Sequence, residues 1–123
     1  MILVDTSVWA QHIRREVKSL SILLEAAEVL THPFVIGEIA MGNLRQRDVV
    51  LRDLQDLQQA IVASDQEVLQ LIDRNNQFGR GIGYVDAYLL AAARLSAGTH
   101  LWTFDNRLAA AAVQLRLEYQ PPK

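Results

Sequence analysis

The chain begins with a three-residue apolar run that stops at an acid. Asp5 follows Ile2–Val4 directly, and Asp105 comes just after a second apolar run around Leu101–Trp102. Between the two runs, apolar residues recur at three- and four-residue steps, which is the spacing of amphipathic helices. Short buried strands that alternate with helices favour a parallel sheet covered on both faces. Ligands of such α/β folds bind at the carboxyl ends of the strands, where both acids are expected.

The same patterns predict the order of the elements along the chain. We expect strands at Ile2–Val4, 28–31, 100–105 and 117–119. We expect helices at 6–14, 19–27, 33–44, 50–61, 68–72, 84–97 and 108–115. No repeat or break in composition divides the 123 residues, so we expect a single domain.

The composition excludes several classes of protein. Hydrophobic residues make up 50% of the chain and charged residues 21%, which is ordinary for a folded protein. The chain has no cysteine, which excludes a disulfide framework, a thiolate metal site and a cysteine nucleophile. Its apolar runs are too short for a membrane span and no signal-peptide pattern is apparent, so we expect a cytoplasmic protein. The net charge of −2 requires any contact with nucleic acid to be local.

Four acids do not fit the polar face of an amphipathic helix. Asp5 and Asp105 stand at strand ends, whereas Glu38 and Asp86 lie on helical faces that otherwise carry apolar residues. We expect all four to point toward the core, where an unpaired carboxylate is costly.

Each of these acids has an explanation of its own, and all four have one in common. Asp5 and Asp105 would suit helix caps, Asp86 would suit a helix amino end, and Glu38 would suit an arginine partner. A divalent cation would satisfy all four at once, and oxygen ligands favour Mg²⁺ or Mn²⁺. Clustered carboxylates repel one another until a cation binds. Such a site activates water and stabilises the charge that develops on phosphorus.

Four short motifs around these acids resemble a known family. They are "LVDTSVW" at 3–9, "GEIAMGN" at 37–43, "VDAYLLAAA" at 85–93 and "WTFDNRL" at 102–108. In this order they resemble the PIN domain family and, within it, the VapC-like ribonuclease toxins of prokaryotic toxin–antitoxin pairs. The resemblance covers essentially residues 1–123. It implies one PIN domain with a three-layer α/β/α fold and a short, mainly parallel sheet.

The resemblance also implies an activity and its residues. The catalytic and metal-binding acids of the family fall on Asp5, Glu38, Asp86 and Asp105. Their hydroxyl neighbours, expected to hold the acids in place, are Thr6, Ser7 and Thr103. The implied activity is Mg²⁺- or Mn²⁺-dependent endoribonuclease cleavage of RNA. The implied partners are a second copy of the chain and a cognate antitoxin whose tail blocks the acidic groove.

The residues around the last acid depart from many relatives, which carry a further acid or an aromatic residue there. Asn106, Arg107 and Leu108 follow Asp105 instead, so Asp105 has to supply the fourth carboxylate by itself. Four arginines are expected either to grip RNA phosphates around the acids or simply to be solvated on the surface. They are Arg14, Arg45, Arg80 and Arg107.

Two rival functions remain beside the nuclease. A non-catalytic PIN-like module would bind RNA or protein without using the acids. A phosphoacceptor receiver domain also has acids at strand ends, but it needs a lysine at a late strand end. The chain has lysine only at Lys18 and Lys123, which disfavours that second rival.

Overall fold

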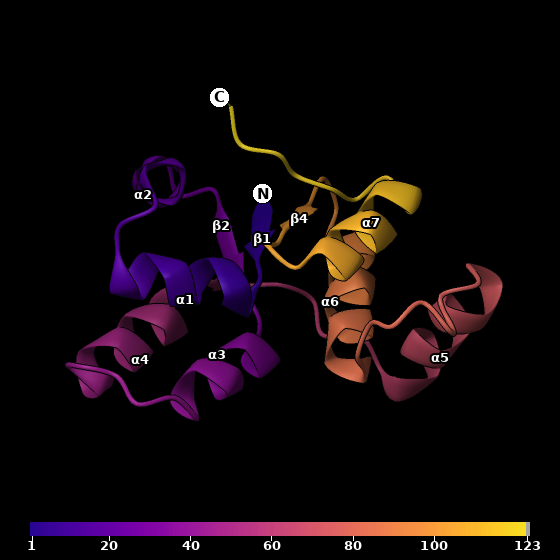
Figure 1. Cartoon of the computed structure of the whole chain (residues 1–123), viewed down its shortest axis with the longest axis horizontal. Coiled ribbons are helices and arrows are strands. Elements are labelled where there is room, and N and C mark those ends of the chain that lie inside the picture. Colours follow the sequence, from indigo (N-terminus) through magenta and orange to yellow (C-terminus); the bar gives the residue numbers. More distant parts are fainter. Residues whose placement is uncertain (123) are drawn as a thin grey trace.

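A four-stranded parallel sheet forms the centre of the structure, a computed structural model that describes residues 1–122 (Figure 1). Its strand order is β3-β2-β1-β4. The strands are β1 (Ile2–Val4), β2 (Val29–Thr31), β3 (Gln58–Gln59) and β4 (His100–Trp102).

Seven helices in the described residues connect the strands and lie on either side of the sheet. They are α1 (Thr6–Arg14), α2 (Lys18–Glu25), α3 (Pro33–Ala40), α4 (Arg47–Asp56), α5 (Asp65–Arg74), α6 (Tyr84–Leu95) and α7 (Asn106–Gln114). Figure 1 shows α1 to α4 on one side of the strands and α5 to α7 on the other. This arrangement confirms the predicted three-layer α/β/α fold.

Pairing on both sides of β1 brings the ends of the strands together. β1 pairs with β2 on one side and with β4 on the other, with Val4 opposite Trp102. The Asp5 backbone N–H donates to the Trp102 carbonyl at 2.9 Å, which extends the ladder past the end of β1. The residues that follow β1 and β4 therefore leave the sheet side by side.

Burial of β1 and α6 explains why the acids are positioned rigidly. Leu3 and Val4 of β1 are fully buried, and every residue of 87–93 in α6 is buried. A helix that is apolar all round belongs in the interior. Asp86 precedes this buried stretch directly, so the core fixes its position.

The second half of the sheet departs from the prediction. The helix expected over 50–61 ends at Asp56, and Gln58–Gln59 forms β3 on the edge of the sheet. Two exposed glutamines carry no apolar alternation, so their strand comes from backbone pairing with β2 alone. The expected strand at 117–119 is reduced to a single bridge between Leu101 and Glu118. No helix within residues 1–122 has the length and apolar character needed to cross a membrane.

Candidate active site

Asp5 is a buried carboxylate held by two hydroxyl groups. Its side chain is 6% exposed and caps the amino end of α1. Oδ2 accepts from Ser7 Oγ at 2.7 Å, from Thr103 Oγ1 at 2.7 Å and from the Ser7 backbone N–H at 3.4 Å. These hydrogen bonds offset the cost of burying a polar group away from water.

The same two hydroxyls join the end of β1 to the segment after β4. Ser7 Oγ accepts from the Phe104 backbone N–H at 2.9 Å, and Thr103 Oγ1 accepts from the Asp105 backbone N–H at 3.0 Å. Ser7 and Thr103 therefore fix both Asp5 and the approach of the chain to Asp105.

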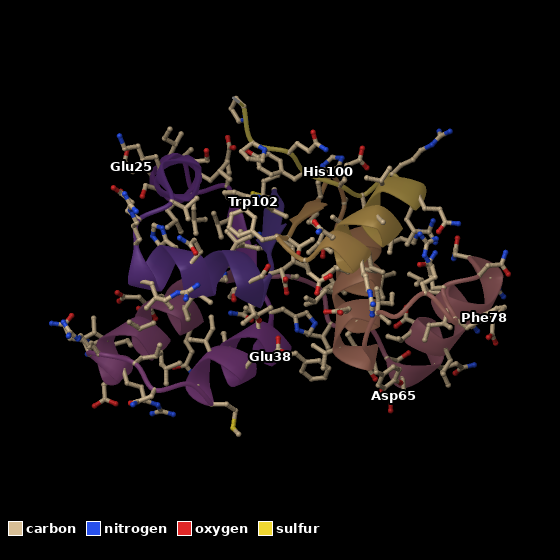
Figure 2. The ribbon with its side chains drawn as sticks, viewed as in Figure 1. Glu25, Glu38, Asp65, Phe78, His100 and Trp102 are labelled. Carbon is tan, nitrogen blue, oxygen red and sulfur yellow. The ribbon has the colours of Figure 1, made fainter. Side chains whose placement is uncertain are left out.

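Glu38 projects from α3 toward α1. Thr6 Oγ1 donates to Glu38 Oε1 at 2.6 Å, so the residue after Asp5 holds a second carboxylate. Figure 2 shows Glu38 on the side of α3 that faces the middle of the molecule. The single turn between β1 and α1 thus positions two of the four acids.

Asp86 lies in the first turn of α6, where the negative charges of the other three acids act on it. Its Oδ2 accepts from the Gly83 backbone N–H at 3.2 Å. Burial raises the pKa of the Asp86 carboxyl above its usual value, and the negative charges of Asp5, Asp105 and Glu38 raise it further. The Gly83 hydrogen bond acts in the opposite direction. Asp86 therefore lies close enough to each of the other three acids for their negative charges to act on it.

Asp105 caps the amino end of α7 and is exposed. Its Oδ1 accepts from the backbone N–H groups of Arg107 at 2.9 Å and Leu108 at 3.1 Å. This is the geometry of a helix cap, as expected for Asp105 from the sequence. The residue therefore caps α7 and is also one of the four acids.

The four carboxylates share a pattern that suits a cation. Among residues 1–122, each uses one oxygen for its hydrogen bonds: Oδ2 of Asp5, Oε1 of Glu38, Oδ2 of Asp86 and Oδ1 of Asp105. The second oxygen of each is left for another ligand. Oxygen donors of this kind fit Mg²⁺ or Mn²⁺. Within residues 1–122, no three acidic, histidine or cysteine side chains lie close enough together to form a ready-made metal site.

Comparison with known proteins shows the family of the chain. The PIN domain family model matches residues 2–114. The chain belongs to the PIN domain family. It is also 49% identical over 114 residues to proteins named Ribonuclease VapC32 from two Mycobacterium tuberculosis strains, CDC 1551 / Oshkosh and ATCC 25618 / H37Rv. Each match covers 93% of this chain and 92% of the relative.

The expectation that all four acids of the PIN domain face the core was wrong for two of them. Asp5 is buried and Asp86 is half-buried, but Glu38 and Asp105 are exposed. The helical face shared by Glu38 also carries Met41, which is 88% exposed. Apolar neighbours on a helix therefore did not identify the core side here, because this part of α3 leaves an apolar surface open.

The four arginines expected near RNA lie on different elements of the fold. Arg107 follows Asp105 in α7, and its Nη1 donates to the Gly81 carbonyl at 3.5 Å. Arg80 donates to Gln114 from the loop before α6. Arg45 is exposed in the loop after α3. Arg14 ends α1, at the opposite end of that helix from Thr6. Arg80 thus lies in the loop that leads to Asp86, and Arg107 contacts the same loop at Gly81.

Two positioning groups of the PIN domain escaped sequence reasoning. His32 Nδ1 accepts from the Phe34 backbone N–H at 3.0 Å and caps α3, the helix of Glu38. Pro33 at the first helical position was the signal, since it places the cap at residue 32. The Gly83 backbone N–H left no signal, because a glycine offers no side chain to interpret.

Replacement of Thr103 by valine should destabilise the PIN domain. Thr103→Val removes a hydrogen bond from the buried Asp5 and leaves the Asp105 N–H without its acceptor. We expect a loss of about 1–3 kcal/mol in the free energy of unfolding, measured by urea denaturation. Thr103→Ser keeps the hydroxyl and should lose much less. A Thr103→Val variant that is no less stable than Thr103→Ser would contradict the role of the hydroxyl, because valine keeps the methyl group and lacks only the hydroxyl.

Replacement of Asp86 by asparagine should stabilise the metal-free protein at neutral pH. Because the pKa of Asp86 is raised, the folded state binds a proton more readily than the unfolded state. Stability therefore falls as pH rises from the usual aspartate range through the raised pKa. Asp86→Asn removes the repulsion and retains an acceptor for the Gly83 N–H, so its melting temperature at pH 7 should exceed the wild-type value.

The difference in melting temperature between wild type and Asp86→Asn should shrink as the pH falls below the usual pKa range of aspartate, because Asp86 is then protonated and uncharged in wild type too. Asp73→Asn is the matched control, because Asp73 is an exposed acid of α5. A melting temperature for Asp86→Asn below wild type at pH 7 would contradict the repulsion.

Proposed function

We propose that this PIN domain is a VapC-like endoribonuclease toxin of the cytoplasm, which hydrolyses RNA phosphodiester bonds with metal-activated water. We further propose that it acts as a homodimer held in check by a cognate antitoxin. The observation that carries the activity is the group of four carboxylates, each with one oxygen left for a further ligand. Membership of the PIN family and the similarity to proteins named Ribonuclease VapC32 support it.

The acids Asp5, Glu38, Asp86 and Asp105 would hold Mg²⁺ or Mn²⁺. When bound, this cation lowers the pKa of a water and stabilises the charge that develops on the phosphate oxygens. The repulsion felt by Asp86 supports the assignment, because a cation would relieve it.

The chain's own residues prepare this site before substrate arrives. Ser7 and Thr103 orient Asp5, and Thr6 orients Glu38. The amino end of α7 orients Asp105. Ligand groups that are already held by hydrogen bonds need no rearrangement during the reaction. Thr6, Ser7 and Thr103 therefore act by positioning the carboxylates.

The phosphate backbone of RNA would meet cations on one side of the acids. Arg107 lies in the first turn of α7, and its side chain rests on Gly81, in the same loop as Arg80. Arginine forms charge-assisted hydrogen bonds with phosphate oxygens. The two other arginines, Arg14 and Arg45, would contact RNA only if it extended along α1 or past α3.

Neutralising any of the four acids should abolish RNA cleavage. We expect Asp86→Asn and Glu38→Gln to cleave RNA slower than wild type by roughly a hundredfold or more, since each removes one ligand of the cation. The measurement is the rate of cleavage of total cellular RNA with Mg²⁺ or Mn²⁺, with RNA ends identified by sequencing. Asp73→Asn should cleave at the wild-type rate.

Thermal melting supplies a second readout of the same proposal. Mg²⁺ or Mn²⁺ should raise the melting temperature of wild type, because a ligand of the native state stabilises it. The shift should be lost in Asp86→Asn and kept in Asp73→Asn. A non-catalytic PIN-like binding module would instead bind RNA equally well with or without these acids, and cleavage by neither form would favour that alternative.

Exposed apolar side chains support the proposed partners. The helix α2 buries part of its apolar face within the chain, since Leu20 and Leu23 are buried. Ile22 and Ile61, however, are more than half exposed. We expect sedimentation at micromolar concentration to give a dimer, and the product of the neighbouring gene to copurify and inhibit cleavage. A chain that sediments only as a monomer would contradict the homodimer.

A further inference from the structure

Gly37 occupies a helix-interior position for which the fold gives no reason. Glycine in the middle of a helix is less favourable than alanine. At Gly81 and Gly98 the backbone has positive φ, which explains a glycine there. Gly37 lies inside α3 with no positive φ, and a Cβ added to it would meet nothing within 4 Å. Packing therefore does not require glycine at 37, and the missing side chain leaves open space.

The open space belongs to a groove that reaches the acids. The groove has a volume of about 320 Å³, and we call it the Gly37 groove. It is lined by Pro33, Phe34, Gly37, Glu38, Met41 and Val85. Glu38 is one of the four acids, and Val85 precedes another, Asp86. The Gly37 groove therefore reaches one of the four acids, Glu38, and the residue next to a second.

One wall of the groove is an aromatic ring held in place by other rings. Phe34 is 38% exposed, and its ring centroid lies 4.9 Å from that of Tyr88 and 5.1 Å from that of His32. Tyr88 and His32 are buried, and Tyr84 packs edge-on against Tyr88. Such contacts fix the ring without covering its exposed part. Phe34 thus presents a rigid aromatic surface beside Glu38.

We propose that the Gly37 groove receives a nucleobase of single-stranded RNA next to the phosphate held at the acids. The inference rests on the proposed ribonuclease function and adds to it the group that recognises the substrate. Nucleobases stack on aromatic side chains of proteins that bind single strands. Met41 supplies a polarisable apolar contact on the same helix. The absence of a side chain at Gly37 leaves room for a flat ring beside Phe34 and Met41.

The size and charge of the groove favour a base over other occupants. Small-ligand sites measure about 300–1,000 Å³, so a groove of about 320 Å³ suits one base rather than a protein helix. Glu38 would repel an anionic group in the groove, whereas a neutral base carries no charge. The phosphates of the same strand would then lie toward the acid group and its cation.

Substitution of Gly37 tests the space directly. Gly37→Ala and Gly37→Leu should keep or raise the melting temperature, because both are better helix formers than glycine. Gly37→Leu should raise the Kd for a fluorescent single-stranded RNA pool about tenfold, the loss expected for one stacked base. Gln66→Leu is the matched control, since it adds leucine at an exposed helical position of α5.

Substitution of Phe34 separates the Gly37 groove from its neighbour. Gly37 also borders a second hollow that contains Ile36 and Gln55, but Phe34 does not. Phe34→Leu should weaken RNA binding about tenfold, whereas Phe34→Tyr should bind as wild type. An abasic RNA of the same length should bind wild type and Phe34→Leu equally, because it has no base to stack.

The outcomes separate this inference from the ribonuclease activity. If wild type cleaves RNA and both Gly37→Leu and Phe34→Leu bind and cleave like it, the base site is wrong and the nuclease stands. If wild type cleaves no RNA, the proposed function fails, and binding that ignores the bases would remove the base site too. If Gly37→Leu instead turns a dimer into a monomer, or loses only the antitoxin, the groove is a protein contact and the inference is overturned.

Discussion

The hydrogen bonds around Asp5 connect the first strand to the segment that carries Asp105. A carboxylate with 6% exposure at the end of β1 needs donors, and Ser7 and Thr103 supply them from two segments almost a hundred residues apart in the chain. Those same hydroxyls accept backbone N–H groups from the segment before Asp105. Satisfying one buried charge therefore fixes the relation between the first strand and the last acid.

Parallel strand order explains why distant acids gather at one edge. Adjacent β1 and β4 end together, and β2 delivers the chain to α3, the helix of Glu38. Only Asp86 reaches the group from a helix outside this pattern, and the buried body of α6 holds it there. This position has a cost, because burial and, in addition, the negative charges of the other three acids raise the pKa of Asp86. Many enzymes keep strain of this kind at the place where a ligand will relieve it.

Sequence patterns predicted what depends on periodicity and missed what depends on backbone pairing. The strand Ile2–Val4 and the acid after it could be predicted, because a buried strand is a short apolar run that ends at a polar residue. The strand Gln58–Gln59 could not be predicted, because two exposed glutamines show no apolar pattern and the strand is defined by its pairing with β2. The exposure of Glu38 was missed for a related reason, since an apolar helical face looks the same whether it meets the core or an open groove. The role of the Gly83 N–H has no side chain to reveal it.

The dual use of Asp5 and Asp105 changes how damage at these positions should be interpreted. Each acid caps a helix as well as facing the acid group. Asparagine caps helices about as well as aspartate, whereas alanine does not. An alanine at either position would therefore mix misfolding with lost chemistry, and cells that survive a toxic form by acquiring such a change would not reveal which property had failed. Replacement of Asp5 or Asp105 by asparagine keeps the helix cap and removes the carboxylate, so it separates folding from reactivity.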